Sequence, residues 1–326
     1  MSNFCRARRG ASLLAFSCLF GSTAFSCYAQ GREDEVVANI ASGRVVAHVT
    51  KEGIAFAIIE ESAEADSIPP RVVAVDSLHL GVMLGAVEWI LPGKDAKPIR
   101  LEKMISHIAT GRRSEASSEM ASDLETIGVA YLEALRPLAE QLHHKVELGP
   151  DEPLFELVII GYGPENYGPE VWLYEYRMEQ EALRGDYMKT RVLRPHTTQL
   201  YPPEKHEPKA LVEVRYPPDL RGPTFQVMIR RNDPEVARIA GSDPRFTKVT
   251  DKIEAGQANA AKFTDAVDFL HALVLATAGK SRFALGKFEE GRGFDWIVPP
   301  EEPVEKAKED KNRPAEAPSL MRKPKP

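Results

Sequence analysis

The chain has 326 residues, and its 48 acidic against 42 basic side chains give a net charge of −6 at neutral pH. This balance disfavours nucleic acid and anionic membranes as partners, because both attract positively charged proteins. Beyond the N-terminal region no stretch reaches the roughly 18 apolar residues that a membrane-spanning helix needs, so we expect no transmembrane segment.

Residues 1–29 have the pattern of a cleaved secretory signal peptide. Three arginines precede an apolar run over residues 11–25, and a small-residue cleavage site ends at Ala29. The run is shorter than the roughly 20 residues of a membrane anchor, so we expect export to the periplasm or the medium. Lipid attachment at Cys27 is the less favoured alternative, because Ala24 stands where such sites carry a larger aliphatic residue.

All three cysteines, Cys5, Cys18 and Cys27, lie in this leader. Cleavage therefore excludes disulfides, thiolate metal sites and cysteine nucleophiles from the remaining 297 residues. Lys and Arg together fall from 42 to 39, which makes the net charge −9. We expect a linker over residues 30–42, a single domain over 43–298, and a disordered tail rich in Pro, Lys and Glu over 299–326.

Four strands are predicted before the first long helix. Residues 44–49 and 54–59 form an expected hairpin around a glycine-containing turn, and residues 71–75 and 81–87 form a second pair. The helix begins at a capping box, Ser122 to Glu125, and shows apolar residues at helical spacing up to Leu142, with Pro137 kinking or dividing it.

Further strands are expected over residues 154–161 and 170–178. The second places Trp172, Tyr174 and Tyr176 on one face, and packing in the core or across strands explains this stripe better than ligand binding. The remaining patterns predict strands, two helices that begin at an aspartate followed by proline, a longer helix and a terminal hairpin. In chain order these are strands over 210–216 and 225–229, helices after Asp233 and Asp243, a helix over 264–278, and strands over 282–287 and 293–298.

This order of elements suits an α+β fold of two stacked, mainly antiparallel β-sheets flanked by helices. Several segments resemble the proteasome β-type subunits of the N-terminal-nucleophile hydrolase fold. They include Gly43 to Ile59 with its Lys-Glu-Gly turn, Arg71-Val-Val-Ala-Val-Asp-Ser-Leu-His-Leu-Gly81, Leu157 to Tyr162, and Ala284 to Ile297. The resemblance is one of pattern and order across residues 43–298.

The resemblance implies a chemistry that this chain lacks at its central position. Enzymes of the family attack with an N-terminal Thr, Ser or Cys at the start of the first strand, and the α-amino group takes the proton. The corresponding residue here is Gly43, which has no nucleophile. Ser42 stands one residue too early, on the other sheet face, and would need a second cleavage because signal removal leaves Gln30 at the terminus.

Glu60 and Arg71 stand where the family has its acid and its lysine. Arginine stays protonated and cannot relay a proton, so we expect a structural Glu60–Arg71 ion pair. Convergence of His48 with both would indicate a degenerate active site. No cofactor or metal is expected: Gly279-Lys280-Ser281 lacks the earlier glycine of a phosphate loop, and the adjacent His143 and His144 point apart on a helix.

The leading hypothesis is an exported, proteasome-like protein without the N-terminal nucleophile, which serves in assembly or binding and is not favoured as an enzyme. Its partners would be further copies of itself or other envelope proteins. The alternative is a secreted amidohydrolase or peptidase of the same fold that uses Ser42. A monomeric envelope protein of unrelated fold is the third possibility.

Overall fold

The computed structural model describes residues 37–61, 67–76, 78–90, 98–105, 117–136, 152–163, 168–182, 188–203, 211–218, 220 and 222–301. The predicted signal peptide, His143 and His144, and the tail from 302 onward lie outside them. The described residues form an α+β fold with mainly antiparallel sheets, as the sequence predicts. No helix among them is long and apolar enough to cross a membrane.

The larger sheet has eight strands in the order β12-β9-β8-β6-β1-β4, and β5 and β7 also pair with β6. Within it only β1 and β4 run parallel. Its strands are β1 (Val37–Ala41), β4 (Ser67–Ile68), β5 (Arg71–Ala74), β6 (His79–Ile90), β7 (Ile99–Arg100), β8 (Phe155–Tyr162), β9 (Pro169–Tyr176) and β12 (His196–Tyr201). Within the segment 30–42 that was expected to be a linker, residues 37–41 form β1 and pair along β6.

The smaller sheet has five antiparallel strands in the order β13-β2-β3-β14-β15. They are β2 (Gly43–Val49), β3 (Gly53–Glu60), β13 (Leu211–Tyr216), β14 (Phe283–Glu289) and β15 (Gly293–Val298). The chain passes from the larger sheet to the smaller one at Ser42, between β1 and β2. A separate hairpin consists of β10 (Met178–Ala182) and β11 (Met188–Val192).

Residues 101–105 are helical, and the helices whose two ends lie within the described residues include α2 (Ser117–Leu135), α4 (Phe225–Arg230), α5 (Pro234–Ser242), α6 (Pro244–Glu254), α7 (Phe263–Thr277) and the short 3-10 helix η2 (Ala258–Ala260). α2 starts five residues before the predicted capping box. Asp233 and Asp243 cap α5 and α6 as predicted, each accepting a backbone N–H two residues later.

The strand predicted over residues 225–229 is wrong, because these residues form α4. Its β-prone composition is overridden by a cap, in which the Thr224 hydroxyl accepts from the backbone N–H of Val227 at 3.2 Å. Phe225 and Ile229 are four residues apart and both buried, so one face of this helical turn enters the core.

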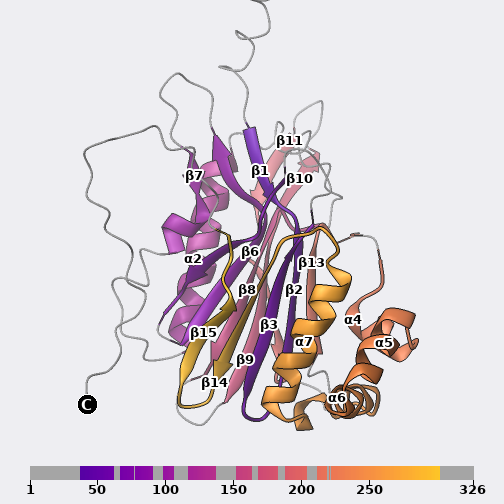
Figure 1. Cartoon of the computed structure of the whole chain (residues 1–326). Helices are drawn as coiled ribbons and strands as arrows, with labels where there is room; N and C mark the ends of the chain where they lie inside the picture. Colours follow the sequence, from indigo (N-terminus) through magenta and orange to yellow (C-terminus); the bar gives the residue numbers. More distant parts are fainter. Residues whose placement is uncertain are drawn as a thin grey trace, which may run out of the picture.

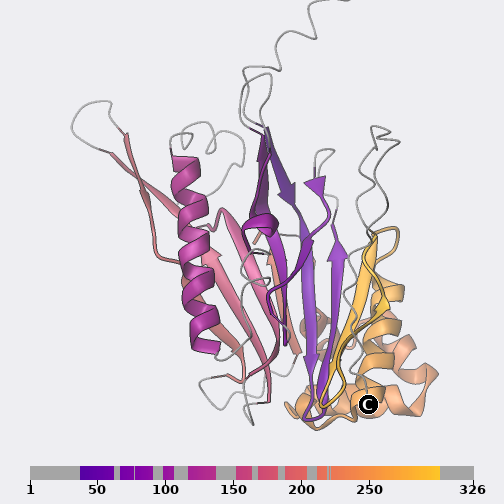
Figure 2. The ribbon, with the colours of Figure 1, turned by 90° about the vertical axis from the view of Figure 1, so that its left-hand side faces the viewer.

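Three buried clusters separate four layers of secondary structure. One lies between the two sheets and draws residues from both, among them Val45, Phe56, Val82 and Val158. A second lies between the smaller sheet and α4 to α7, and a third between the larger sheet and α2. Figure 1 shows α7 across the smaller sheet, and Figure 2 shows α2 on the opposite side of the molecule from α5 to α7.

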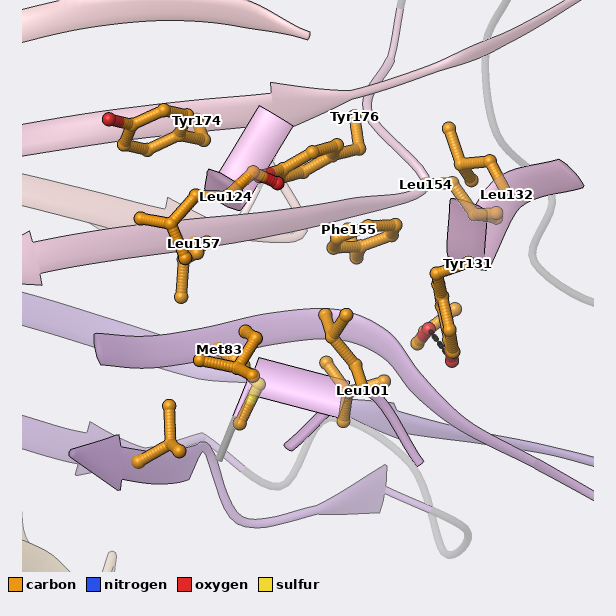
Figure 3. Packing of buried hydrophobic residues seen from close by; sticks show 14 of the residues in the cluster. Met83, Leu101, Leu124, Tyr131, Leu132, Leu154, Phe155, Leu157, Tyr174 and Tyr176 are labelled. Carbon is orange, nitrogen blue, oxygen red and sulfur yellow. Dashed lines mark hydrogen bonds between the residues drawn. The ribbon is translucent and has the colours of Figure 1, made fainter. Parts of the chain in front are cut away.

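The cluster under α2 is rich in aromatic side chains (Figure 3). Phe155 stacks on Tyr176 with ring centroids 4.3 Å apart, and Tyr131 meets Phe155 edge-on at 5.2 Å. Tyr174 and Tyr176 are buried and Trp172 packs against them half-buried, so the predicted aromatic stripe serves packing. Gly128 of α2 lies against the Tyr176 ring, and a Cβ at this position would collide with it.

Two glycines in helices allow a matched test of this packing. Gly128→Ala is expected to destabilise the fold by about 1–3 kcal/mol, because the added methyl group overpacks the Tyr176 contact. Gly241→Ala in α5 meets no atom within 4 Å and is expected to stabilise by up to about 1 kcal/mol through helix propensity. Urea unfolding of both variants gives the change in unfolding free energy for each. A Gly128→Ala variant more stable than the native protein would contradict this packing.

Candidate functional site at the Gly43 end of the inter-sheet core

Gly43 lies at one end of the layer between the two sheets. Successive side chains of a strand alternate between faces, and Val45 and Ala47 of β2 belong to the inter-sheet cluster. Position 43 therefore faces the same layer. Its neighbours in register are Glu60 on β3 and Tyr216 on β13.

The structure leaves no room for a side chain at Gly43. A Cβ built there would collide with the carbonyl oxygen of Ile59 and come within 2.9 Å of the Cγ of Pro70. The first of these contacts is backbone, which cannot rotate away as a flexible side chain can. Residue 43 therefore contributes close packing between β2 and β3 instead of a reactive group.

Ser42 is buried, with only 5% of its surface exposed, at the crossing from β1 to β2. Its carbonyl oxygen accepts a hydrogen bond from the backbone N–H of Glu61 at 3.2 Å. The preceding strand β1 is paired with β6 over five residue pairs. A free amino group at Ser42 would therefore require a cut between this crossing and a strand built into the larger sheet.

The expected Glu60–Arg71 ion pair is wrong. Glu60 instead accepts from Nε and Nη2 of Arg282, at 2.7 and 2.9 Å. β14 runs beside β3 and brings Arg282 to Glu60, whereas Arg71 begins β5 in the other sheet. There its Nε lies 3.9 Å from Oε2 of Glu102.

His48 does not join these residues either. It lies five residues along β2, about 17 Å from Gly43 at the usual rise per residue. The side chain is fully buried under η2, where Nε2 lies 3.0 Å from the Ala258 carbonyl oxygen. Burial lowers the pKa of His48 to about 4, against the opposing effect of this hydrogen bond. The ring is therefore neutral at pH 7, and Nε2 donates to the carbonyl.

A different set of polar residues lies at the Gly43 end, and sequence analysis missed it. His196, Glu175 and Glu156 stand directly opposite one another on β12, β9 and β8, and together with Arg177, which donates to Glu175, we call them the polar row. Val158 and Leu173, two residues from Glu156 and Glu175, lie in or against the inter-sheet cluster, so the row faces that layer.

Tyr216, on β13 of the smaller sheet, contacts the chain just before β8, close to this row. Its hydroxyl group donates to the carbonyl oxygens of Pro153 and Leu154, at 3.2 and 3.1 Å. Leu154 is two residues before Glu156, and the charge of Glu156 adds to the burial that raises the pKa of Tyr216. Because Tyr216 pairs with Gly43, the polar row and Gly43 belong to the same end of the layer.

The charges in the polar row are unevenly matched. Glu175 accepts from Nη2 of Arg177 and lies within hydrogen-bond distance of Nδ1 of His196, both at 2.8 Å. Glu156 is 4% exposed, and burial, with the Glu175 charge, raises its pKa to about 8, while Arg177 partly offsets this. At pH 7 Glu156 is therefore mostly protonated. Its Oε2 atom and Nε of Arg177 are buried without hydrogen-bond partners.

A second polar cluster lies at the other end of β8 and is fully paired. The buried His79 ring joins two carboxylates, with Nδ1 2.9 Å from Asp76 and Nε2 2.7 Å from Glu170. Burial alone would lower the pKa of His79, but the hydrogen bonds and charges of both carboxylates outweigh it and raise the pKa to about 9. Because both ring nitrogens lie within hydrogen-bond distance of a carboxylate, this cluster links the β5–β6 turn to β9.

The described part of the chain brings together no three His, Asp or Glu side chains that could hold a metal ion. The polar row did leave one signal in the sequence. Glu156 interrupts an apolar strand at an inward-facing position, and such an acid needs a partner or a proton. Its neighbours could not be foreseen, because they come from strands whose register is set only in the folded sheet.

Comparison with known proteins adds no identification. No protein-family model matches the chain, and no curated protein matches its sequence.

Replacing Glu156 with Gln should change the pH dependence of stability. The carboxyl group titrates near 4.5 in the unfolded chain and near 8 in the fold, so the folded state holds an extra proton between these values. Stability of the native protein therefore falls as pH rises through this window. E156Q has no carboxyl group to titrate and lacks this loss. The unfolding free energy of E156Q minus that of the native protein should therefore be larger at pH 8 than at pH 4, by about 2 kcal/mol or more.

Urea unfolding of both proteins at pH 4, 6 and 8 gives the difference directly. If the difference in unfolding free energy between the two proteins is constant with pH, or shifts in favour of the native protein as pH rises, Glu156 is not held protonated.

Proposed function

We propose that this chain is an exported, proteasome-like protein of the N-terminal-nucleophile-hydrolase type that acts by binding or assembly and not by hydrolysis. Support comes from the layer order, in which the first hairpin, β2–β3, lies beside the terminal hairpin, β14–β15, in one sheet. A second sheet packs on it, and helices cover the outer faces. This is the arrangement that the resemblance implies.

The observation that carries the proposal is the closed position at Gly43. A nucleophile there would need space for a Cβ and its hydroxyl group, and the Ile59 carbonyl and Pro70 fill that space. Hydrolysis through this position would also need a base and an electrophilic pocket beside it. Arg71 and His48 lie elsewhere, and Glu60 is held by Arg282.

What remains at this end is a set of polar groups suited to recognition. The polar row combines a neutral buried acid, an ion pair and a solvent-facing imidazole within one layer. Such groups orient a ligand through hydrogen bonds without needing a reactive atom. Binding of a small molecule or of a segment from an envelope protein, or assembly with other copies, is the role that this geometry supports.

The alternative enzyme working through Ser42 makes an opposite prediction about the mature terminus. The chain should be expressed with its leader, recovered from the exported fraction, and incubated with a β-lactone that acylates N-terminal hydroxyl nucleophiles. Intact-mass spectrometry is expected to show a terminus at Gln30 and no adduct. A terminus at Ser42 that carries one lactone would overturn the proposal and establish the enzyme.

A further inference from the structure

We propose that the polar row binds an amide group, such as a peptide bond or a terminal carboxamide, between Arg177 and Glu156. This inference rests on the proposed binding role and names the chemistry of its ligand. Glu175 lies between the two in the pairing: it stands opposite Glu156 and forms an ion pair with Arg177. None of the three was singled out by the family resemblance.

Two buried atoms in this row, Oε2 of Glu156 and Nε of Arg177, lack hydrogen-bond partners. Nε of Arg177 carries an N–H donor, and the mostly protonated carboxyl group of Glu156 has one oxygen that accepts and one hydroxyl group that donates. Buried polar atoms are nearly always paired in native proteins, and each exception calls for an explanation. The unpaired Arg177 nitrogen and the unpaired Glu156 oxygen, whose side chains both neighbour Glu175, are explained together if one bound group satisfies both.

The ligand must then accept a hydrogen bond from Arg177 and pair with the neutral carboxyl group of Glu156, as donor or as acceptor. An ammonium group cannot accept, and a carboxylate would bring a second negative charge beside Glu175. Arg177 is already neutralised by Glu175, so no net charge is required of the ligand. An amide meets these conditions, because its carbonyl oxygen accepts from Arg177 and its N–H donates to Glu156.

The polar row also reaches solvent, which gives the ligand a way in. Exposure of the side chain rises from Glu156, at the buried end, through Arg177 at 31% to His196 at 66%. His196 lies on β12, the last strand of the larger sheet in its pairing order. A narrow amide group can therefore approach along the row from this edge, with the remainder of the ligand outside.

The test uses N-acetyl-trialanine amide as the probe and the exported chain as the protein. Isothermal titration calorimetry at pH 7 should give a dissociation constant below about 10 mM. A matched ester analogue, in which oxygen replaces the internal N–H groups and a methyl ester replaces the terminal carboxamide, should bind at least about fivefold more weakly, because it lacks every amide donor.

Glu156→Leu removes the acceptor and keeps an apolar side chain of similar size. The dissociation constant should rise at least about tenfold while the melting temperature at pH 8 rises, and loss of folding cannot produce that combination. Arg177→Met, which removes the donor, should weaken binding by a similar factor. Glu235→Gln, which removes an exposed carboxylate on α5, is the control and should leave the constant unchanged.

Each other outcome rejects the amide assignment. Absence of binding to the native protein at about 10 mM, equal binding of the ester, or full affinity in both E156L and R177M would each do so. Binding that is strong but indifferent to these variants leaves the binding role in place and moves the site elsewhere. Hydrolysis of the probe in the same sample would overturn the proposed function, while the affinities would still test the site.

Discussion

At Gly43 the backbone of β2 lies close to the Ile59 carbonyl oxygen and to the ring of Pro70, at one end of the layer between the two sheets. β2 packs its first residue against the Ile59 carbonyl oxygen and Pro70, and only a hydrogen atom fits between them. Tyr216, the neighbour of Gly43 in the sheet, reaches across the layer and bonds to the chain just before β8. These hydrogen bonds hold the smaller sheet against the larger one at the Gly43 end of the layer.

The two polar clusters at opposite ends of β8 differ in a way that bears on function. The His79 cluster is complete, since each ring nitrogen faces a carboxylate. The polar row keeps a buried acid and a guanidinium nitrogen without partners beside a solvent-facing imidazole. A fully paired cluster avoids the cost of buried unpaired polar groups, whereas the unpaired atoms of the polar row lower stability.

Local signals in the sequence were sufficient for much of the fold. The two hairpins at the ends of the domain, the aspartate caps of α5 and α6 and the helix before Gly279 each depend on residues a few positions apart. β1 and α4 were missed because their identity depends on tertiary contacts, with β6 in one case and with the helical layer in the other. The candidate site was harder to predict than the fold. The position of Gly43 follows from the sequence pattern. The placing of Arg282 beside Glu60 and of Glu175 opposite Glu156 depends on strand register between residues more than 15 positions apart.

The unfolding free energy of Gly43→Ala tests the central claim most directly. Strand propensity alone favours alanine over glycine, so a gain in stability is expected wherever a methyl group fits. The contact with the Ile59 carbonyl reverses this sign, and the variant should lose about 1–3 kcal/mol in urea unfolding. A Gly43→Ala protein as stable as the native chain or more so would show that position 43 has space for a side chain, and the case against an N-terminal nucleophile would fail with it.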